Sequence, residues 1–120
     1  MANGMNKVFL LGNVGADPEL RFADSATPLL KLRLATTERY RDKNEQWQER
    51  TEWHNVTVRG PRAAALAKIL GKGERIMVEG RIETRSYQDA VNRQRWTTEV
   101  RARDVYLTGA RRDVAQRLGA

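Results

Sequence analysis

Apolar and polar residues alternate in several separate stretches of the chain. Leu30, Leu32 and Leu34 alternate with Lys31 and Arg33, so that one face of this segment is leucine and the other mainly basic. Such alternation is typical of a half-buried strand, because successive side chains point to opposite faces of a sheet. The same reasoning predicts four further strands, at residues 8–22 (bent at a turn near Asp17-Pro18), 51–59, 75–87 and 96–107. The pattern is that of a mostly β protein.

One segment has the composition of a helix. Pro61 suits a first helical turn, residues 62–70 are rich in Ala and Leu, and Gly71 and Gly73 end the run. The polar stretches 39–49 and 88–95 have no periodicity and predict long loops, while a parity change at Arg103-Asp104 predicts a bulge. Five strands with a helix between the third and fourth match a five-stranded OB-fold barrel. We therefore predict an all-β fold with one helix, spanning residues 1–110, and a short basic segment at 111–120.

Charge narrows the range of partners. The 120 residues contain 22 Lys and Arg against 15 Asp and Glu, a formal net charge of +7, and seventeen of these cations are Arg. Arg suits phosphates and stacking on bases, so nucleic acid or an anionic membrane surface becomes the expected partner. A membrane partner is disfavoured, because the sequence has no basic amphipathic helix with a broad apolar face. The length allows a single domain.

Several classes of protein are excluded or disfavoured by what the sequence lacks. It has no cysteine, which excludes disulfides, zinc ribbons and a thiol nucleophile, and it has no apolar run of the roughly 20 residues that span a bilayer. The opening residues do not resemble a signal peptide, so a cytoplasmic location is expected. His54 is the only histidine, and the acidic pairs lack catalytic neighbours. We predict no catalytic residue, no metal and no cofactor, and hence a protein that is not an enzyme.

Five segments resemble the bacterial single-stranded DNA-binding proteins. These segments are NKVFLLGNVGADPELRF, LATTERYRDK, TEWHNVTVRG, LGKGERIMVEGRIETRSY and RWTTEV, in family order over residues 6 to about 107. The resemblance implies a protein that coats and protects single-stranded DNA in replication, recombination and repair. It also implies a homotetramer, or dimer of dimers, joined through first-strand edges and sheet faces, with His54 at a subunit interface.

Aromatic residues beside cations are what sequence-independent binding of a single strand requires, because every base has a π-face and every nucleotide a charge. Tyr40, Trp53 and Tyr87 each lie close to Arg or Lys in the sequence and are predicted to stack on bases. The resemblance implies the same three positions, with tyrosine at two of them where the family commonly has tryptophan. Trp53 could instead cover a subunit contact.

Three further residues are less clear candidates for stacking. Arg59 stands where the family usually has an aromatic residue, and its guanidinium could stack on a base or bind a phosphate. Trp47, in a predicted loop, is either a DNA contact or an incidental surface residue. Trp96 shares parity with the core position Val100, which favours packing or a subunit interface.

Nine basic residues are predicted to bind phosphates: Lys7, Arg33, Arg41, Lys43, Arg50, Arg62, Lys72, Arg85 and Arg95. Family members typically continue into a long linker and an acidic tip that recruits partner enzymes, whereas residues 111–120 are basic. Recruitment of replication and repair proteins is therefore expected only if such a tail exists. Two alternatives stay open: a primosomal or RNA-binding OB-fold accessory protein, and an OB-fold adaptor between proteins.

Overall fold

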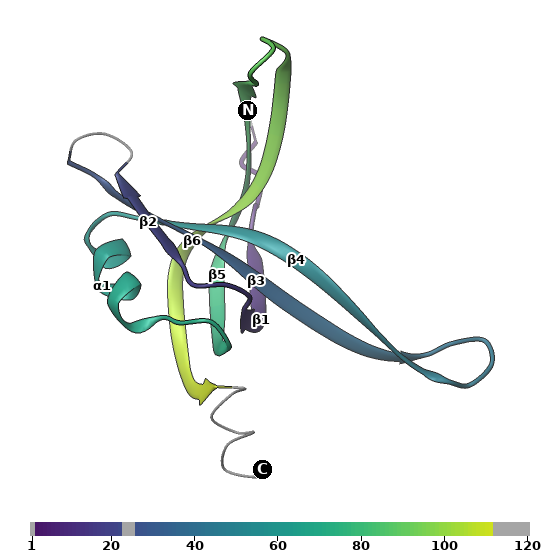
Figure 1. Ribbon diagram of the computed structural model, residues 1–120. Helices are drawn as coiled ribbons and strands as arrows, with labels where there is room; N and C mark the ends of the chain where they lie inside the picture. Colours follow the sequence, from purple (N-terminus) through teal and green to yellow (C-terminus); the bar gives the residue numbers. More distant parts are fainter. Residues whose placement is uncertain (1, 23–25, 112–120) are drawn as a thin grey trace.

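A closed barrel of five strands forms the centre of the computed structural model, which describes residues 2–22 and 26–111 (Figure 1). The elements are β1 (Val8–Val14), β2 (Glu19–Phe22), β3 (Pro28–Arg41), β4 (Trp47–Arg59), α1 (Pro61–Ile69), β5 (Glu74–Gln88) and β6 (Gln94–Arg111). The strands follow the order β1-β5-β6-β4-β3, and β1 pairs with β3 to close the barrel. The predicted fold, with its helix between the third and fourth barrel strands, is confirmed.

The core follows the alternation in the sequence. Leu30, Leu32 and Leu34 of β3 are buried, and in register they face Val58, Val56 and His54 of β4. The buried apolar residues are Val14, Leu30, Leu32, Leu34, Val56, Val58, Ala63, Leu70, Ile76, Val78 and Val100. The opposite parity of β3 and β4 faces away from this core, as predicted, although Thr57 on that face is itself buried.

Helix α1 begins directly after a backbone turn that glycine favours. Gly60 has a φ of 91°, and Pro61 occupies the first helical position, where its missing N–H breaks no hydrogen bond. Ala63 is the buried residue of the helix, and α1 packs against β2, β3 and β4. The predicted helix is confirmed to within one residue at each end.

The predicted first strand is divided in two. β1 pairs with β5 along its length and with β3 only at Asn13 and Val14, whereas β2 pairs with β3 from Glu19 onward. Pro18 lies in the gap and has no N–H to contribute to a ladder. The first segment therefore keeps to one edge of β3 but is interrupted between Val14 and Glu19.

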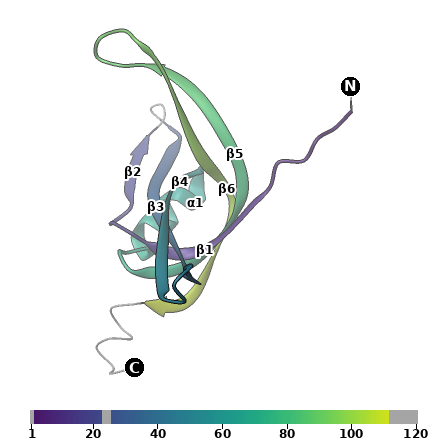
Figure 2. The same ribbon diagram turned by 90° about the vertical axis from the view of Figure 1, so that its right-hand side faces the viewer.

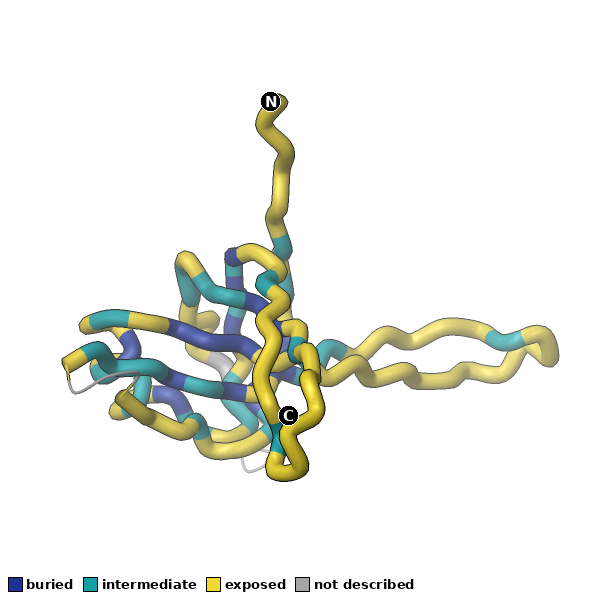
Figure 3. Tube along the Cα trace, turned by 90° about the horizontal axis from the view of Figure 1, so that it is seen from above, coloured by how far each residue is buried: buried dark blue, intermediate teal, exposed yellow. Residues whose placement is uncertain are grey.

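Both predicted long loops are shorter than expected, because their ends belong to strands and only residues 42–46 and 89–93 form turns. β3 and β4 pair as far as Arg41 and Trp47, and β5 and β6 as far as Gln88 and Gln94. The two hairpins extend beyond the barrel as exposed ribbons, which we call the β3–β4 arm and the β5–β6 arm (Figures 1 and 3). A ribbon with solvent on both sides needs no apolar alternation, so the sequence pattern carried no strand signal at residues 39–41 and 47–49 of the β3–β4 arm.

A compact turn ends the β3–β4 arm. Asp42 Oδ1 accepts hydrogen bonds from the backbone N–H groups of Asn44 and Gln46, both at 2.9 Å, and Glu45 has a positive φ of 60°. These bonds, the N–H of Gln46 first, hold the pKa of Asp42 below its usual range.

The β5–β6 arm ends in the same kind of turn. Asp89 Oδ1 accepts the N–H groups of Val91 at 3.0 Å and Arg93 at 2.9 Å, and Asn92 has a φ of 65°. The pKa of Asp89 is lowered, chiefly by the N–H of Arg93 and then by the side chain of Arg95. An Asp five residues before the first residue of the returning strand thus organises both tips.

The predicted bulge in the last strand is confirmed. Glu79 pairs with Asp104, but the next residue, Gly80, pairs with Ala102, so Arg103 is the extra residue on β6. The predicted basic segment at 111–120 lies outside the described residues, apart from Arg111 at the end of β6.

Candidate nucleic-acid interface

A groove of about 390 Å³ lies between the outer face of β3 and β4 and the base of the β5–β6 arm. Arg33 of β3, Asn55 and Thr57 of β4, and Arg85 and Glu99 of the β5–β6 arm line it. Two predicted phosphate-binding residues, Arg33 and Arg85, therefore reach one groove from different hairpins.

Glu99 fixes the direction of Arg85. The residue Glu99 is 7% exposed, and its Oε1 accepts a hydrogen bond from Nε of Arg85 at 3.0 Å. A buried carboxylate requires such a partner. The Arg85 side chain stays 47% exposed, so its guanidinium can still contact a ligand in the groove.

Trp53 lies beside this groove and is held from two directions. The guanidinium carbon of Arg33 lies 4.8 Å from the centroid of the indole ring, and Gly15 packs so closely against the ring edge that a Cβ there would collide with it. Gly15 is itself fixed, because its N–H donates to the carbonyl oxygen of Arg33 at 2.9 Å. Half of the Trp53 surface remains exposed. The predicted stacking residue thus presents an oriented aromatic plane.

The β3–β4 arm carries aromatic and arginine side chains on both of its sides. Arg41 faces Trp47 in register and lies 5.6 Å from its ring centroid, while Arg39 lies 5.1 Å from the same centroid. On the other side of the ribbon, Arg50 lies 5.1 Å from the centroid of Tyr40. Both rings are exposed. Lys43, also predicted to bind phosphate, is at the turn.

Tyr87 and Arg95 occupy opposite positions near the tip of the β5–β6 arm. Nε of Arg95 donates to Asp89 Oδ2 at 3.1 Å, which ties this arginine to the turn. Trp96 is on the other side of the ribbon and is 65% exposed. Its predicted packing within the chain is wrong, because the ribbon extends beyond the core at that point. Its alternative place, in a subunit interface, stays a prediction.

The remaining predicted phosphate-binding residues do not line the groove. Lys7 pairs with Glu79 at 3.7 Å and Arg62 with Asp104 at 3.0 Å, while Lys72 follows α1. Their predicted contacts with phosphate stay predictions.

Arg59 and His54 have polar partners within the chain. Arg59, at the end of β4, has its Nη2 3.9 Å from Glu83 Oε1. The half-buried His54 shares a hydrogen bond of 2.9 Å with Thr36 Oγ1.

Some residues of the interface were not singled out from the sequence. Alternation along β4 already placed Asn55 and Thr57 on the same face as Trp53, so the sequence could have indicated both as interface residues. Glu99 and Arg39 depend on contacts across the sheet, which a linear pattern does not give. In the described ranges, 2–22 and 26–111, no group of three potential metal ligands occurs, and α1 is too short to span a membrane.

Comparison with known sequences assigns the chain to a protein family. A sequence profile described as the single-strand binding protein family matches residues 5–108. The chain belongs to this family. Among single-strand binding proteins, single-stranded DNA-binding protein 1 of Xylella fastidiosa is 37% identical over 110 residues, which are 91% of this chain and 81% of that protein. The single-stranded DNA-binding protein of Rhizobium meliloti is 42% identical over 102 residues, covering 83% of this chain but 59% of the relative.

Solved structures of single-strand binding proteins have the same architecture. A Plasmodium falciparum SSB in complex with single-stranded DNA is similar with a TM-score of 0.79 and 27% identity, over 89% of this chain and 97% of that one. A deletion mutant of the Thermus aquaticus single-stranded DNA-binding protein gives a TM-score of 0.77 and 33% identity, over 89% and 52% of the two chains.

Proposed function

We propose that this protein binds single-stranded DNA without sequence preference and protects it during replication, recombination and repair. The observation that carries the proposal is the oriented, half-exposed ring of Trp53 under Arg33, beside a groove that also holds Arg85. Membership of the single-strand binding protein family supports it. Binding of this kind requires no catalytic step.

Base stacking supplies one part of the binding energy. Trp53, Tyr40, Trp47 and Tyr87 all expose a substantial part of their rings, and stacking contributes roughly 1–3 kcal/mol per base. The arginines over Trp53, Trp47 and Tyr40 hold these rings and add cation–π contacts. Stacking does not distinguish bases strongly, so the protein should accept any base composition.

Phosphate neutralisation supplies the other part. Arg33 and Arg85 lie at the groove, and Arg41, Arg50 and Arg95 lie along the two arms. Each phosphate neutralised on a single strand contributes about 0.7 to the slope of log affinity against log salt concentration. A steep salt dependence is therefore part of the proposal.

Titration of Trp53→Ala with oligo-dT tests the stacking mechanism. Loss of the ring should weaken binding by roughly 1–3 kcal/mol. Trp53→Phe is the matched control, because it keeps an aromatic plane and should recover much of the affinity. Unchanged affinity in Trp53→Ala would contradict the proposed role of the ring. Equal binding of duplex DNA or RNA by the unmodified protein would contradict the proposed preference for single-stranded DNA.

We also propose that the protein assembles as a homotetramer built from dimers. Phe9 and Leu11 of β1 are exposed, and Leu11 pairs with Met77 of β5, which in turn pairs with the exposed Tyr106 of β6. These residues form one apolar outer face, which we call the Phe9 face. Exposed apolar patches of this kind are typical of interaction sites. One edge of β1 pairs with β5. The other edge, from Val8 to Gly12, has no paired strand among the described residues, and β-pairing with a second copy would cover it.

A further inference from the structure

Three arginines share one carboxylate at the base of the β5–β6 arm. Arg81 Nη2 and Arg101 Nη1 each lie 3.5 Å from Glu83 Oε2, and Arg59 Nη2 lies 3.9 Å from Glu83 Oε1. Three positive charges against one negative charge leave this cluster with a net charge of +2. Among the ion pairs of the described residues, no other carboxylate pairs with three arginines.

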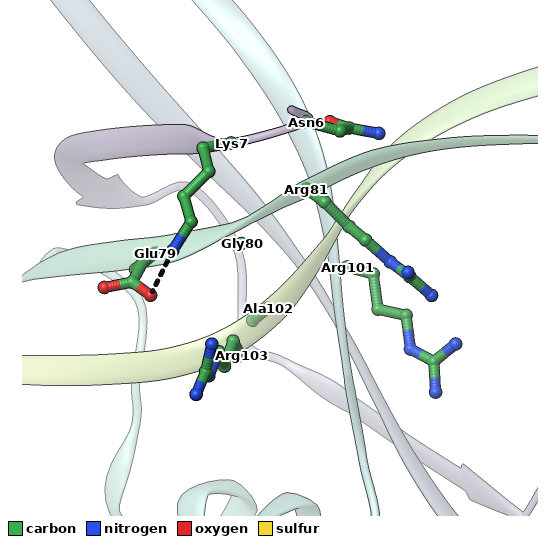
Figure 4. A pocket seen from close by; sticks show the side chains of 8 residues that line it. All are labelled: Asn6, Lys7, Glu79, Gly80, Arg81, Arg101, Ala102 and Arg103. Carbon is green, nitrogen blue, oxygen red and sulfur yellow. Dashed lines mark ion pairs between the residues drawn. The ribbon is translucent and has the colours of Figure 1, made fainter. Parts of the chain in front are cut away.

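The arrangement places like charges opposite each other in the sheet. Arg81 and Arg101 are directly opposite each other in the β5–β6 register. Figure 4 shows that both side chains leave their strands in the same direction and lie side by side. Like charges at such positions destabilise a sheet, and both side chains are largely exposed, at 56% and 38%. Glu83 offsets part of this repulsion, but stability of the barrel alone does not explain three arginines at one carboxylate.

The backbone beside the two arginines is shaped to bring their strands close. Gly80 precedes Arg81, and a Cβ at Gly80 would collide with the backbone carbonyl of Arg101. Arg103, the extra residue of the bulge, lies just beyond. Arg81, Arg101 and Arg103 line one hollow of about 380 Å³, which Figure 4 shows. Oxygen atoms of an anion could enter beside the guanidinium groups from this side.

The cluster continues the groove described above. Arg101 pairs in register with Thr57 of β4, which lines the groove, and Glu83 stands two residues before Arg85 on the same face of β5. Two residues along a strand span about 7 Å. A single strand leaving the groove toward the end of β4 would therefore pass over the three arginines.

Glu83 does not use the full donor capacity of these arginines. Each guanidinium has five N–H donors in a planar fork that fits two oxygens of a phosphate. The distances of 3.5–3.9 Å to Glu83 exceed the about 2.8 Å of a charge-assisted hydrogen bond. The carboxylate thus holds the side chains in place without binding them tightly.

We propose that Arg59, Arg81 and Arg101 form a phosphate clamp that binds a phosphodiester of single-stranded DNA beyond the groove. Glu83 occupies the clamp in the free protein, and the phosphate displaces it. The clamp rests on the proposed function and adds a binding subsite to it. It also assigns Arg59 to phosphate rather than to base stacking.

Salt titrations of single charge variants test the clamp. Oligo-dT affinity is measured over a range of salt concentrations for Arg81→Gln, Arg101→Gln and Lys68→Gln. Lys68 is exposed on α1, so its variant has the same net charge without touching the clamp. Either clamp variant should bind several-fold more weakly at low salt and lower the salt slope by about 0.7, the value for one lost phosphate contact. Slopes equal to that of Lys68→Gln would overturn the proposal.

Glu83→Gln tests the displacement step. Removing the competing carboxylate should raise oligo-dT affinity, and unchanged or weaker binding would overturn displacement. Quenching of the tryptophan fluorescence at saturating oligo-dT should persist in every variant, which separates failure of the clamp from failure of the proposed function. The mass in solution is measured in parallel. A changed mass with an unchanged salt slope would assign the arginines to a subunit contact and overturn the clamp.

Discussion

Gly15 is as much a part of the stacking site as Trp53 itself. The indole ring packs against the Cα of Gly15 and under the guanidinium of Arg33, which leaves one oriented surface for a base. Orienting a side chain before binding lowers the conformational entropy lost when the ligand arrives. A residue without a side chain is required at position 15, because any Cβ would occupy the space of the ring.

Gly15→Ala should therefore weaken DNA binding without removing any DNA-contacting group. The added methyl group must push the Trp53 ring away from its position under Arg33. We expect a loss of oligo-dT affinity comparable to that of Trp53→Ala, roughly 1–3 kcal/mol, and a shifted tryptophan emission maximum in the free protein. Gly4→Ala is the control, since Gly4 has open space around it. Equal affinities of the two variants would contradict the positioning role of Gly15.

The two turns offer a reciprocal test of backbone strain. Glu45 and Asn92 occupy equivalent positions with φ of 60° and 65°, but only asparagine tolerates this region well. Glu45→Asn should raise the free energy of unfolding by about 0.5–1 kcal/mol, and Asn92→Glu should lower it by a similar amount. Urea unfolding of both variants measures the two changes. Changes of the same sign would show that strain does not control these turns.

At the scale of elements, the sequence pattern predicted those strands and that helix whose faces differ in polarity. The leucines of β3 and the valines of β4 are buried as predicted, and α1 follows Pro61. The β5–β6 arm was largely predicted as strand, but the outer part of the β3–β4 arm was missed. Strands exposed on both sides are stabilised by cross-strand contacts such as the hydrogen bond of 3.0 Å between Thr37 and Thr51. Such contacts depend on register, which periodicity does not supply.

The same limit applies to the interface. Stacking residues could be proposed from aromatics beside cations, but pairs such as Arg33 with Trp53, or Arg101 with Arg81, come from different strands. From the sequence alone, Lys7 and Arg85 are equally good candidates for binding phosphate. The folded chain places them at different sites: Arg85 lines the groove, whereas Lys7 lines the hollow beside Arg81 and Arg103.

The ends of both arms should loosen in acid. The pKa of Asp42 and of Asp89 is lowered in the folded protein, so each carboxylate stabilises its turn at pH above the ordinary aspartate value of 3.8. This stabilisation is lost as the pH falls from that value through the lower folded pKa. Hydrogen exchange at the N–H groups of Gln46 and Arg93 should accelerate over that window, relative to the barrel amides at each pH.

Asp42→Asn provides the control for this pH dependence. The amide oxygen can still accept the N–H of Gln46 but does not titrate, so protection at Gln46 should become independent of pH in the acid range. Protection at Arg93 should keep its pH dependence, because Asp89 is unchanged. A pH-dependent loss at Gln46 that persists in this variant would assign the effect to another group.

At the scale of the whole molecule, polar arms extend from a small barrel that leaves apolar surface uncovered. The arms are exposed on both sides, and the N-terminal segment before β1 extends away from the barrel (Figures 2 and 3). The Phe9 face lies on strands β1, β5 and β6, whereas the groove lies over β3, β4 and the base of the β5–β6 arm. Subunits can therefore meet through one face while each keeps its groove open, which allows one strand of DNA to contact several subunits.

Phe9→Glu should break the proposed assembly while leaving the barrel intact. Phe9 is 64% exposed, so its replacement costs the isolated chain little, but the new carboxylate would stand opposite Glu79 in register and carry charge into the Phe9 face. Light scattering after size-exclusion chromatography should show a tetramer for the unmodified protein and a dimer or monomer for the variant.

Phe22→Glu is the matched control, because Phe22 is 61% exposed on β2, away from this face, and should keep the tetramer mass. With oligo-dT added, the variant should bind with lower avidity, because fewer linked sites hold the same strand. Equal masses for the two variants would rule out the Phe9 face as the assembly contact.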